Sequence, residues 1–151
     1  MGVPEFQSQH IFIADDDEDD RFFFQEVVSE MPYVVHFSMA RDGEETILKL
    51  QQSDQLPDLL FLDLNMPIKN GLECLQEIKA SSRLQEIPVI IFSTSSYPST
   101  INQAYDAGAH LYIRKPNDFL SFKRVMQYVL SVNWKDNLLR PPREEFLLRL
   151  D

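Results

Sequence analysis

The carboxylate of Asp63 lies where a protein can do chemistry. The apolar run "LPDLLFLDLNMP" brings Asp63 to the end of a predicted buried strand and then breaks at Pro67. Three other apolar runs also end in reactive side chains, namely Asp15 and Asp16 in "IFIADDDEDD", Ser93 in "IPVIIFSTS" and Lys115 in "AHLYIRKP". Carboxylates, a hydroxyl and an amine are together the groups that phosphoryl transfer requires.

These residue types predict a role for each side chain. Three carboxylates in one pocket repel one another unless a cation neutralises them, and an all-oxygen ligand set open to phosphate favours Mg²⁺. The predicted metal ligands are Asp15, Asp16, Asp63 and the backbone carbonyl of Asn65. Asp63 is the predicted nucleophile that becomes an acyl phosphate, with Lys115 holding phosphoryl oxygens and Ser93 donating a hydrogen bond to the phosphoryl group.

Apolar strands alternate with amphipathic helical patterns along the chain. The predicted strands are continuous apolar runs, typical of strands buried on both faces, at 11–14, 34–39, 59–63, 89–93 and 110–114. The predicted helices carry apolar residues three and four positions apart, at 19–31, 44–51, 72–80, 99–107 and 118–132. In the first helix Phe23, Val27 and Val28 are expected to face the sheet, and the run 22–24 cannot place all three Phe rings on one face.

The alternation predicts an α/β fold with a doubly wound parallel sheet, because parallel strands need long right-handed crossovers. Five such units are too few for an eight-stranded barrel. In an open sheet of this kind the carboxyl ends of all strands lie at one edge, so the reactive side chains should converge there.

Composition narrows the function classes. With 151 residues the chain is long enough for one domain, and 24 acidic against 14 basic residues give a formal charge of −10. That charge argues against nucleic acid and anionic membranes as partners. The single cysteine, Cys74, is predicted to be buried and reduced, and the absence of a signal-like or spanning segment favours a cytoplasmic protein.

The chain resembles the receiver domains of two-component response regulators. The resemblance covers about residues 10–132 and rests on five motifs in order: "DDD" at 15–17, "DLNMPIKNG" at 63–71, "FSTS" at 92–95, "YDAGA" at 105–109 and "YIRKP" at 112–116. It implies a flavodoxin-like fold with strand order 2-1-3-4-5 and five helices. It also implies that a histidine kinase or phosphotransfer protein phosphorylates Asp63.

The resemblance implies a switch as well. Ser93 would move toward the phosphate and Tyr112 would turn inward, and the peptide bond between Lys115 and Pro116 would be cis. Many receivers have a threonine at the position of the switch hydroxyl, whereas this chain has Ser93. Serine lacks the methyl group that restricts the side-chain rotamer of threonine. Asn117 or Asp118 is expected to cap the last helix.

Two alternatives belong to other classes. A haloacid-dehalogenase-like phosphatase would use Asp15 as nucleophile with Asp17, Ser93 or Thr94, and Lys115, but it leaves Asp63 unexplained. The second alternative is a docking module that is never phosphorylated. Acids at 17–20 also have an ordinary structural explanation, since carboxylates at a helix N-terminus stabilise the helix dipole.

The predicted division of the chain is an N-terminal extension at 1–9, a receiver at 10–132 and a tail at 133–151. The tail is too short to fold independently, so the effector is predicted to be another protein, reached by phosphorylation-dependent docking or by phosphorelay. Within "REEFLLRL", Phe146, Leu147 and Leu150 would form one apolar strip of a short helix. We expect that strip to pack on the domain or on a second copy in a homodimer.

Overall fold

The central feature of the computed structural model, which describes residues 8–135 and 140–150, is a five-stranded parallel sheet. Its strand order is β2-β1-β3-β4-β5, as predicted. The strands are β1 (Ser8–Ala14), β2 (Val34–Ala40), β3 (Leu59–Leu62), β4 (Val89–Ser93) and β5 (Leu111–Arg114).

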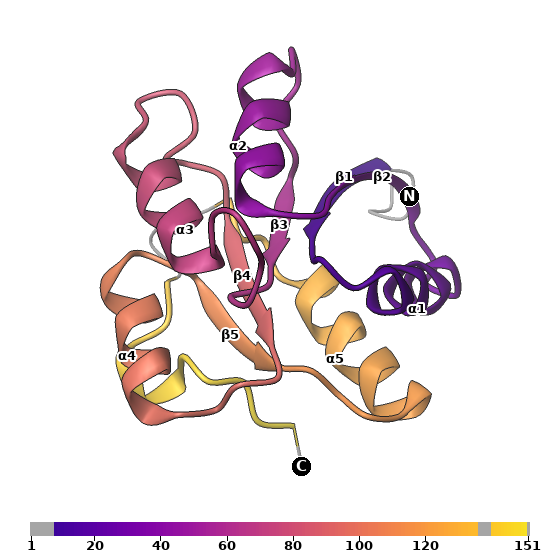
Figure 1. Cartoon of the computed structure of the whole chain (residues 1–151). Helices are drawn as coiled ribbons and strands as arrows, with labels where there is room; N and C mark the ends of the chain where they lie inside the picture. Colours follow the sequence, from indigo (N-terminus) through magenta and orange to yellow (C-terminus); the bar gives the residue numbers. More distant parts are fainter. Residues whose placement is uncertain (1–7, 136–139, 151) are drawn as a thin grey trace.

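Helices cover both faces of the sheet (Figure 1). The helices α1 (Glu18–Ser29) and α5 (Phe119–Ser131) pack on one face. The other face carries α2 (Gly43–Gln52), α3 (Gly71–Ala80) and α4 (Pro98–Asp106). The predicted doubly wound architecture is confirmed. Element ends agree with the sequence prediction to within two residues, except that β1 begins at Ser8 rather than Ile11.

Successive strand residues supply two separate hydrophobic layers. In β1, Ile11 and Ile13 pack with the side chains of α1 and α5, whereas Phe12 packs with those of α2 and α3. All three are at most 2% exposed. Burial on both faces explains why the central strands are continuous apolar runs and not alternating ones. The same expectation was wrong for β2, which lies at the edge of the sheet and is buried only at Ala40.

The Phe run of α1 divides between core and solvent. Phe24 is fully buried, with its ring centroid 4.8 Å from that of Phe61, whereas Phe22 is 62% exposed. Phe23 is only partly buried but packs against the same core, with its ring centroid 5.2 Å from that of Phe122, so the fully buried ring lies one position after the one expected to face the sheet. The buried set Phe24, Val27 and Val28 follows the three- and four-residue spacing of one helical face.

Asp118 caps α5, as one of the two expected capping residues. Its side chain accepts a hydrogen bond from the Ser121 backbone N–H at 2.8 Å. This cap fixes where α5 begins, only a few residues after Lys115 leaves the sheet.

The described part of the tail pairs with the outer edge of β5. The Tyr112 N–H donates to the Phe146 carbonyl at 3.0 Å, and the Leu148 N–H donates to the Tyr112 carbonyl at 2.9 Å. The Phe146 side chain is fully buried. This part of the tail therefore packs on its own domain. Between residues 140 and 150 the helical backbone is confined to the 3₁₀ helix Arg143–Glu145 and does not extend along the predicted apolar strip.

Contacts with Tyr105 hold the tail against α4. The Arg140 and Arg143 guanidinium groups lie 3.9 and 4.5 Å from the centroid of the Tyr105 ring. The Tyr105 hydroxyl donates to the Pro141 carbonyl at 3.2 Å. Arginine stacked on an aromatic ring contributes a cation–π attraction in addition to packing.

The predicted chain divisions fall partly on residues outside the described ranges, namely 1–7, 136–139 and 151. Among the described residues, none of the helices is long and apolar enough to cross a membrane.

Replacing Phe146 with alanine should lower the free energy of unfolding by about 3 kcal/mol, because a fully buried ring leaves a cavity between Tyr105 and Tyr112. Denaturant titration measures this change. Leu150→Ala, at a position 37% exposed in the same tail, should cost less than about 0.5 kcal/mol. Equal midpoints for the two variants would mean that the tail does not pack on the domain in solution.

Candidate functional site

Backbone hydrogen bonds hold the site residues in place just beyond the ends of the strands. The Asp15 N–H donates to the Ala40 carbonyl at 3.1 Å, and the Asp63 N–H donates to the Ala14 carbonyl at 2.9 Å. The Lys115 N–H likewise donates to the Ser93 carbonyl at 2.9 Å. These residues therefore lie in register at the carboxyl edge of the sheet, the edge at which doubly wound folds bind ligands.

Gly71, the first residue of α3, allows that helix to approach the Asp63 backbone. Its N–H donates to the Leu64 carbonyl at 2.9 Å. A Cβ atom at this position would lie 2.1 Å from the Asp63 carbonyl oxygen. Only glycine fits this approach without moving the loop that presents Asp63.

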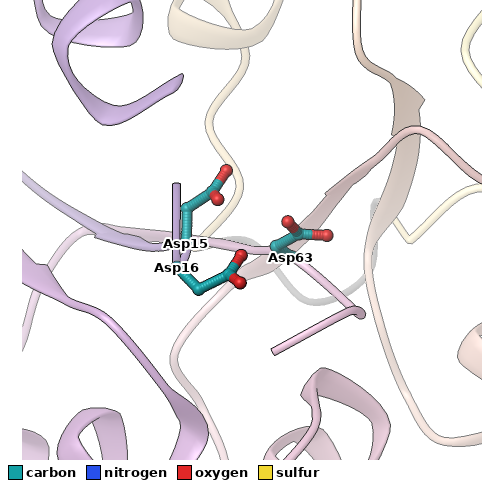
Figure 2. A group of neighbouring side chains, drawn as sticks. All are labelled: Asp15, Asp16 and Asp63. Carbon is teal, nitrogen blue, oxygen red and sulfur yellow. The ribbon is translucent and has the colours of Figure 1, made fainter. Parts of the chain in front are cut away.

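Three carboxylates gather at this edge, as predicted. Figure 2 shows Asp15 and Asp16, which follow β1, beside Asp63, which follows β3. One oxygen from each lies within 4.8 Å of the others. Asp15 and Asp63 are buried, whereas Asp16 is exposed. An all-oxygen set with one side open to solvent fits a hard divalent cation that keeps some of its water.

Lys115 supplies the positive charge inside this group. Its Nζ lies 2.8 Å from Asp15 Oδ2, 2.8 Å from Asp20 Oδ2 and 3.0 Å from Asp63 Oδ2. Burial of the ammonium opposes its charge, but hydrogen bonds to Asp15 and Asp20 and the charge of Asp63 outweigh burial and raise the pKa of Lys115. The amine therefore remains protonated throughout the physiological range.

Burial perturbs the pKa of the Asp15 carboxyl group. Burial raises its pKa to about 6, and hydrogen bonds from Lys115 and from the Asp17 N–H act in the opposite direction. Its side chain is 1% exposed. Asp15 therefore depends on Lys115, or on a bound cation, to carry its charge at neutral pH.

Ser93 and Tyr112 both form hydrogen bonds with Ser95, in the loop that follows β4. Ser93 is fully buried, and its Oγ accepts from the Ser95 N–H at 3.2 Å. The Tyr112 hydroxyl donates to the Ser95 carbonyl at 2.7 Å, and its ring is already fully inside the structure. Burial raises the pKa of Tyr112, which keeps the phenol protonated as a hydrogen-bond donor.

Asn65 and Pro116 complete the predicted set. The Asn65 N–H donates to Asp63 Oδ1 at 3.3 Å, while its carbonyl as a metal ligand stays a prediction. The cis peptide expected between Lys115 and Pro116 is wrong for this structure, whose described residues contain no cis peptide bond. A trans bond before proline is the form that the local energetics favour, by about 0.5–1 kcal/mol.

Sequence reasoning missed the contact between Asp20 and Lys115. The acids at 17–20 are expected to stabilise the helix dipole, and Asp17 does cap α1 by accepting from the Asp19 and Asp20 N–H groups. Asp20, however, turns its side chain to the site. The available signal was its position in the first turn of α1, which begins only three residues after Asp15 at the strand end.

The fold is that of a receiver, and the chain belongs to the response regulator receiver domain family. The model of that family matches residues 11–127. The alternative prediction of a haloacid-dehalogenase-like phosphatase is therefore wrong about the class of protein. Asp17, the second acid of that scheme, instead caps α1.

Relatives of known name are similar over most of the chain. Response regulator Rcp1 from Synechocystis sp. is 29% identical over 87% of this chain and 92% of its own length. Two-component response regulator ORR5 from Oryza sativa subsp. japonica is 30% identical over 85% of this chain and 94% of its own.

Solved structures agree with the fold. The phosphorylated cyanobacterial phytochrome response regulator RcpA is 30% identical with a TM-score of 0.78, over 90% of this chain and 100% of that one. The Mn²⁺-bound form of response regulator Rcp1 is 28% identical with a TM-score of 0.75, over 89% of this chain and 99% of that one.

Lys115→Met should destabilise the protein more at pH 8 than at pH 5 when divalent cations are chelated. In the folded protein the pKa of Asp15 is about 6, above its ordinary value, so the folded state binds this proton more tightly than the unfolded state. Ionisation of Asp15 therefore lowers the free energy of unfolding as the pH rises through that value. Without Lys115 the ionised Asp15 is buried and unpaired, which should lower the free energy of unfolding by about 3 kcal/mol at pH 8.

Denaturation midpoints in EDTA at the two pH values measure this difference. The control is Lys123→Met, which removes an amine paired with Glu30 on the surface. That variant should show no pH-dependent loss. A Lys115→Met loss of equal size at both pH values would contradict the dependence of Asp15 on Lys115.

Proposed function

We propose that this receiver accepts a phosphoryl group on Asp63 from a histidine kinase or a phosphotransfer protein, in a Mg²⁺-dependent reaction. The observation that carries the proposal is the grouping of the Asp63 carboxylate with Asp15 and Asp16 under the Lys115 ammonium. A relative that has been observed in a phosphorylated form, RcpA, supports it.

In the proposed reaction a carboxylate oxygen of Asp63 attacks phosphorus. The new bond is the O–P bond of an acyl phosphate, and the bond that breaks joins phosphorus to the donor, whose electron pair leaves with the donor imidazole or carboxylate. Lys115 stabilises the charge of the phosphoryl oxygens, and Ser93 and backbone N–H groups of the β4 loop donate to them. Asp63 lies at the carboxyl edge of the sheet beside the exposed Asp16, the side from which a donor would approach.

Asp15, Asp16, Asp63 and the Asn65 carbonyl would hold the metal ion. When bound, Mg²⁺ supplies neutralisation of the carboxylates and a Lewis acid for the phosphoryl oxygens. Asp15 and Asp63 are the buried ligands and Asp16 is the exposed one, on the side that is open to water and substrate. The Mn²⁺-bound form of Rcp1, a relative, supports a divalent ion at such a site.

Ser93 and Tyr112 are the proposed switch. Movement of Ser93 toward the phosphoryl group would disturb its contact with Ser95, whose carbonyl accepts from the Tyr112 hydroxyl. The signal would pass to another protein by docking or phosphorelay, as a shift between two conformations of this region.

Asp63→Asn should abolish incorporation of acid-stable, base-labile label from radiolabelled acetyl phosphate in Mg²⁺, because an amide oxygen is a poor nucleophile. Label is measured after acid quench and gel separation. Asp54→Asn, an exposed acid after α2, is the control and should label like wild type.

Label retained on Asp63→Asn at the wild-type level would refute Asp63 as the acceptor. If wild type itself takes no label from either acetyl phosphate or a panel of histidine kinases, the unphosphorylated docking module becomes the better description.

Asp16→Asn should raise the Mg²⁺ concentration needed for half-maximal labelling by about tenfold. Substitutions near a bound metal ion commonly weaken its binding by about this factor. Calorimetric titration of Mg²⁺ gives the same affinity without phosphorylation. Glu18→Gln removes an equal charge from the exposed start of α1 and is the matched control. Identical Mg²⁺ affinities for the two variants would remove Asp16 from the ligand set.

A further inference from the structure

The ammonium of Lys115 has no hydrogen-bond donor left for a phosphoryl group. A lysine ammonium has three N–H donors. In this structure Lys115 Nζ is within 3.0 Å of oxygens from three carboxylates, those of Asp15, Asp20 and Asp63. An arriving phosphoryl oxygen can bond to Lys115 only if one of these contacts is given up.

The three contacts differ in how easily they are released. The side chains of Asp15 and Asp63 are 1% and 7% exposed, so an oxygen that loses Lys115 there has little access to water. The Asp20 side chain is 40% exposed. Water can replace Lys115 at Asp20, and an exposed ion pair contributes little because water competes with it. Asp20 is therefore the contact that yields.

Asp20 also differs from the other carboxylates in its origin. It comes from α1 and not from a strand end, and its N–H donates to Asp17 within the capped first turn. The cap fixes the backbone of Asp20 with respect to β1, so its carboxylate is held within reach of Lys115 before any phosphoryl group arrives.

We infer that Asp20 is a positioning residue that competes with the phosphoryl group for Lys115. In the unphosphorylated state Lys115 bonds to Asp20; in the phosphorylated state that donor turns to a phosphoryl oxygen and Asp20 is hydrated. This inference rests on phosphorylation of Asp63. If so, Asp20 slows the transfer of the phosphoryl group to Asp63. It also makes the phosphorylated state less stable than it would be without Asp20.

The test compares Asp20→Asn with Asp19→Asn at about 0.15 M salt, where charges that are not in contact are screened within about 8 Å. Both variants remove one negative charge from the first turn of α1, but the exposed Asp19 has no contact with Lys115. The measurements are the initial rate of labelling by acetyl phosphate at fixed Mg²⁺ and the rate at which the label is then lost.

Asp20→Asn should label about fourfold faster than wild type and lose its label more slowly, since a competing exposed ion pair changes an equilibrium by about that factor. Asp19→Asn should match wild type in both rates. Asp20→Glu, which restores the charge and has room at a half-exposed position, should return both rates to the wild-type level. A gain in rate cannot come from damage to the fold, and thermal midpoints check that all variants are equally folded.

The results separate this inference from the function on which it rests. If wild type labels on Asp63 and Asp20→Asn behaves like Asp19→Asn, Asp20 does not compete and the inference fails alone. A slower rate in Asp20→Asn would also overturn it, because Asp20 would then support Lys115. If wild type takes no label on Asp63, phosphorylation itself is refuted.

Discussion

The site depends on one ammonium that is shared among three carboxylates at the edge of a parallel sheet. Lys115 lies within 3.0 Å of oxygens from Asp15, Asp20 and Asp63, and it follows a strand that is not adjacent to β1 or β3. Burying Asp15 without that charge would be costly, since an unpaired carboxylate loses its hydration. The acids and Lys115 therefore require one another, and the strand order of the sheet is what brings them together.

The same sheet connects the site to the outer edge of β5. The hydroxyl of Ser93 and that of Tyr112 both contact the backbone of Ser95. On its other side Tyr112 pairs through its backbone with the tail, and its ring lies 6.1 Å from that of Phe146. The tail thus covers the edge strand and packs behind the aromatic residue nearest the site. A covered edge also removes a row of unpaired backbone groups that could pair with another chain.

Much of this fold could be predicted because local patterns are strong. Continuous apolar runs marked the central strands, which are covered on both faces, and three- and four-residue spacing marked the helices, which are covered on one. The placement of Phe24 in the core could have been predicted, because Phe24, Val27 and Val28 have the three- and four-residue spacing of one helical face. The course of the tail was undetermined, because the burial of Phe146 between Tyr105 and Tyr112 is a contact between distant segments.

The sequence by itself determined which side chains end the strands and, through the parallel topology, that Asp15, Asp16, Asp63 and Lys115 meet at one edge. It also determined the family, through the order of its motifs. Only the tertiary structure decided how the charge is shared: that Asp20 from α1 takes a third contact on Lys115, that Asp16 is the exposed acid, and that Tyr112 is enclosed by the tail. These features depend on the angle at which a helix or tail meets the sheet. That angle is set by packing between residues far apart in the chain, which no local pattern encodes.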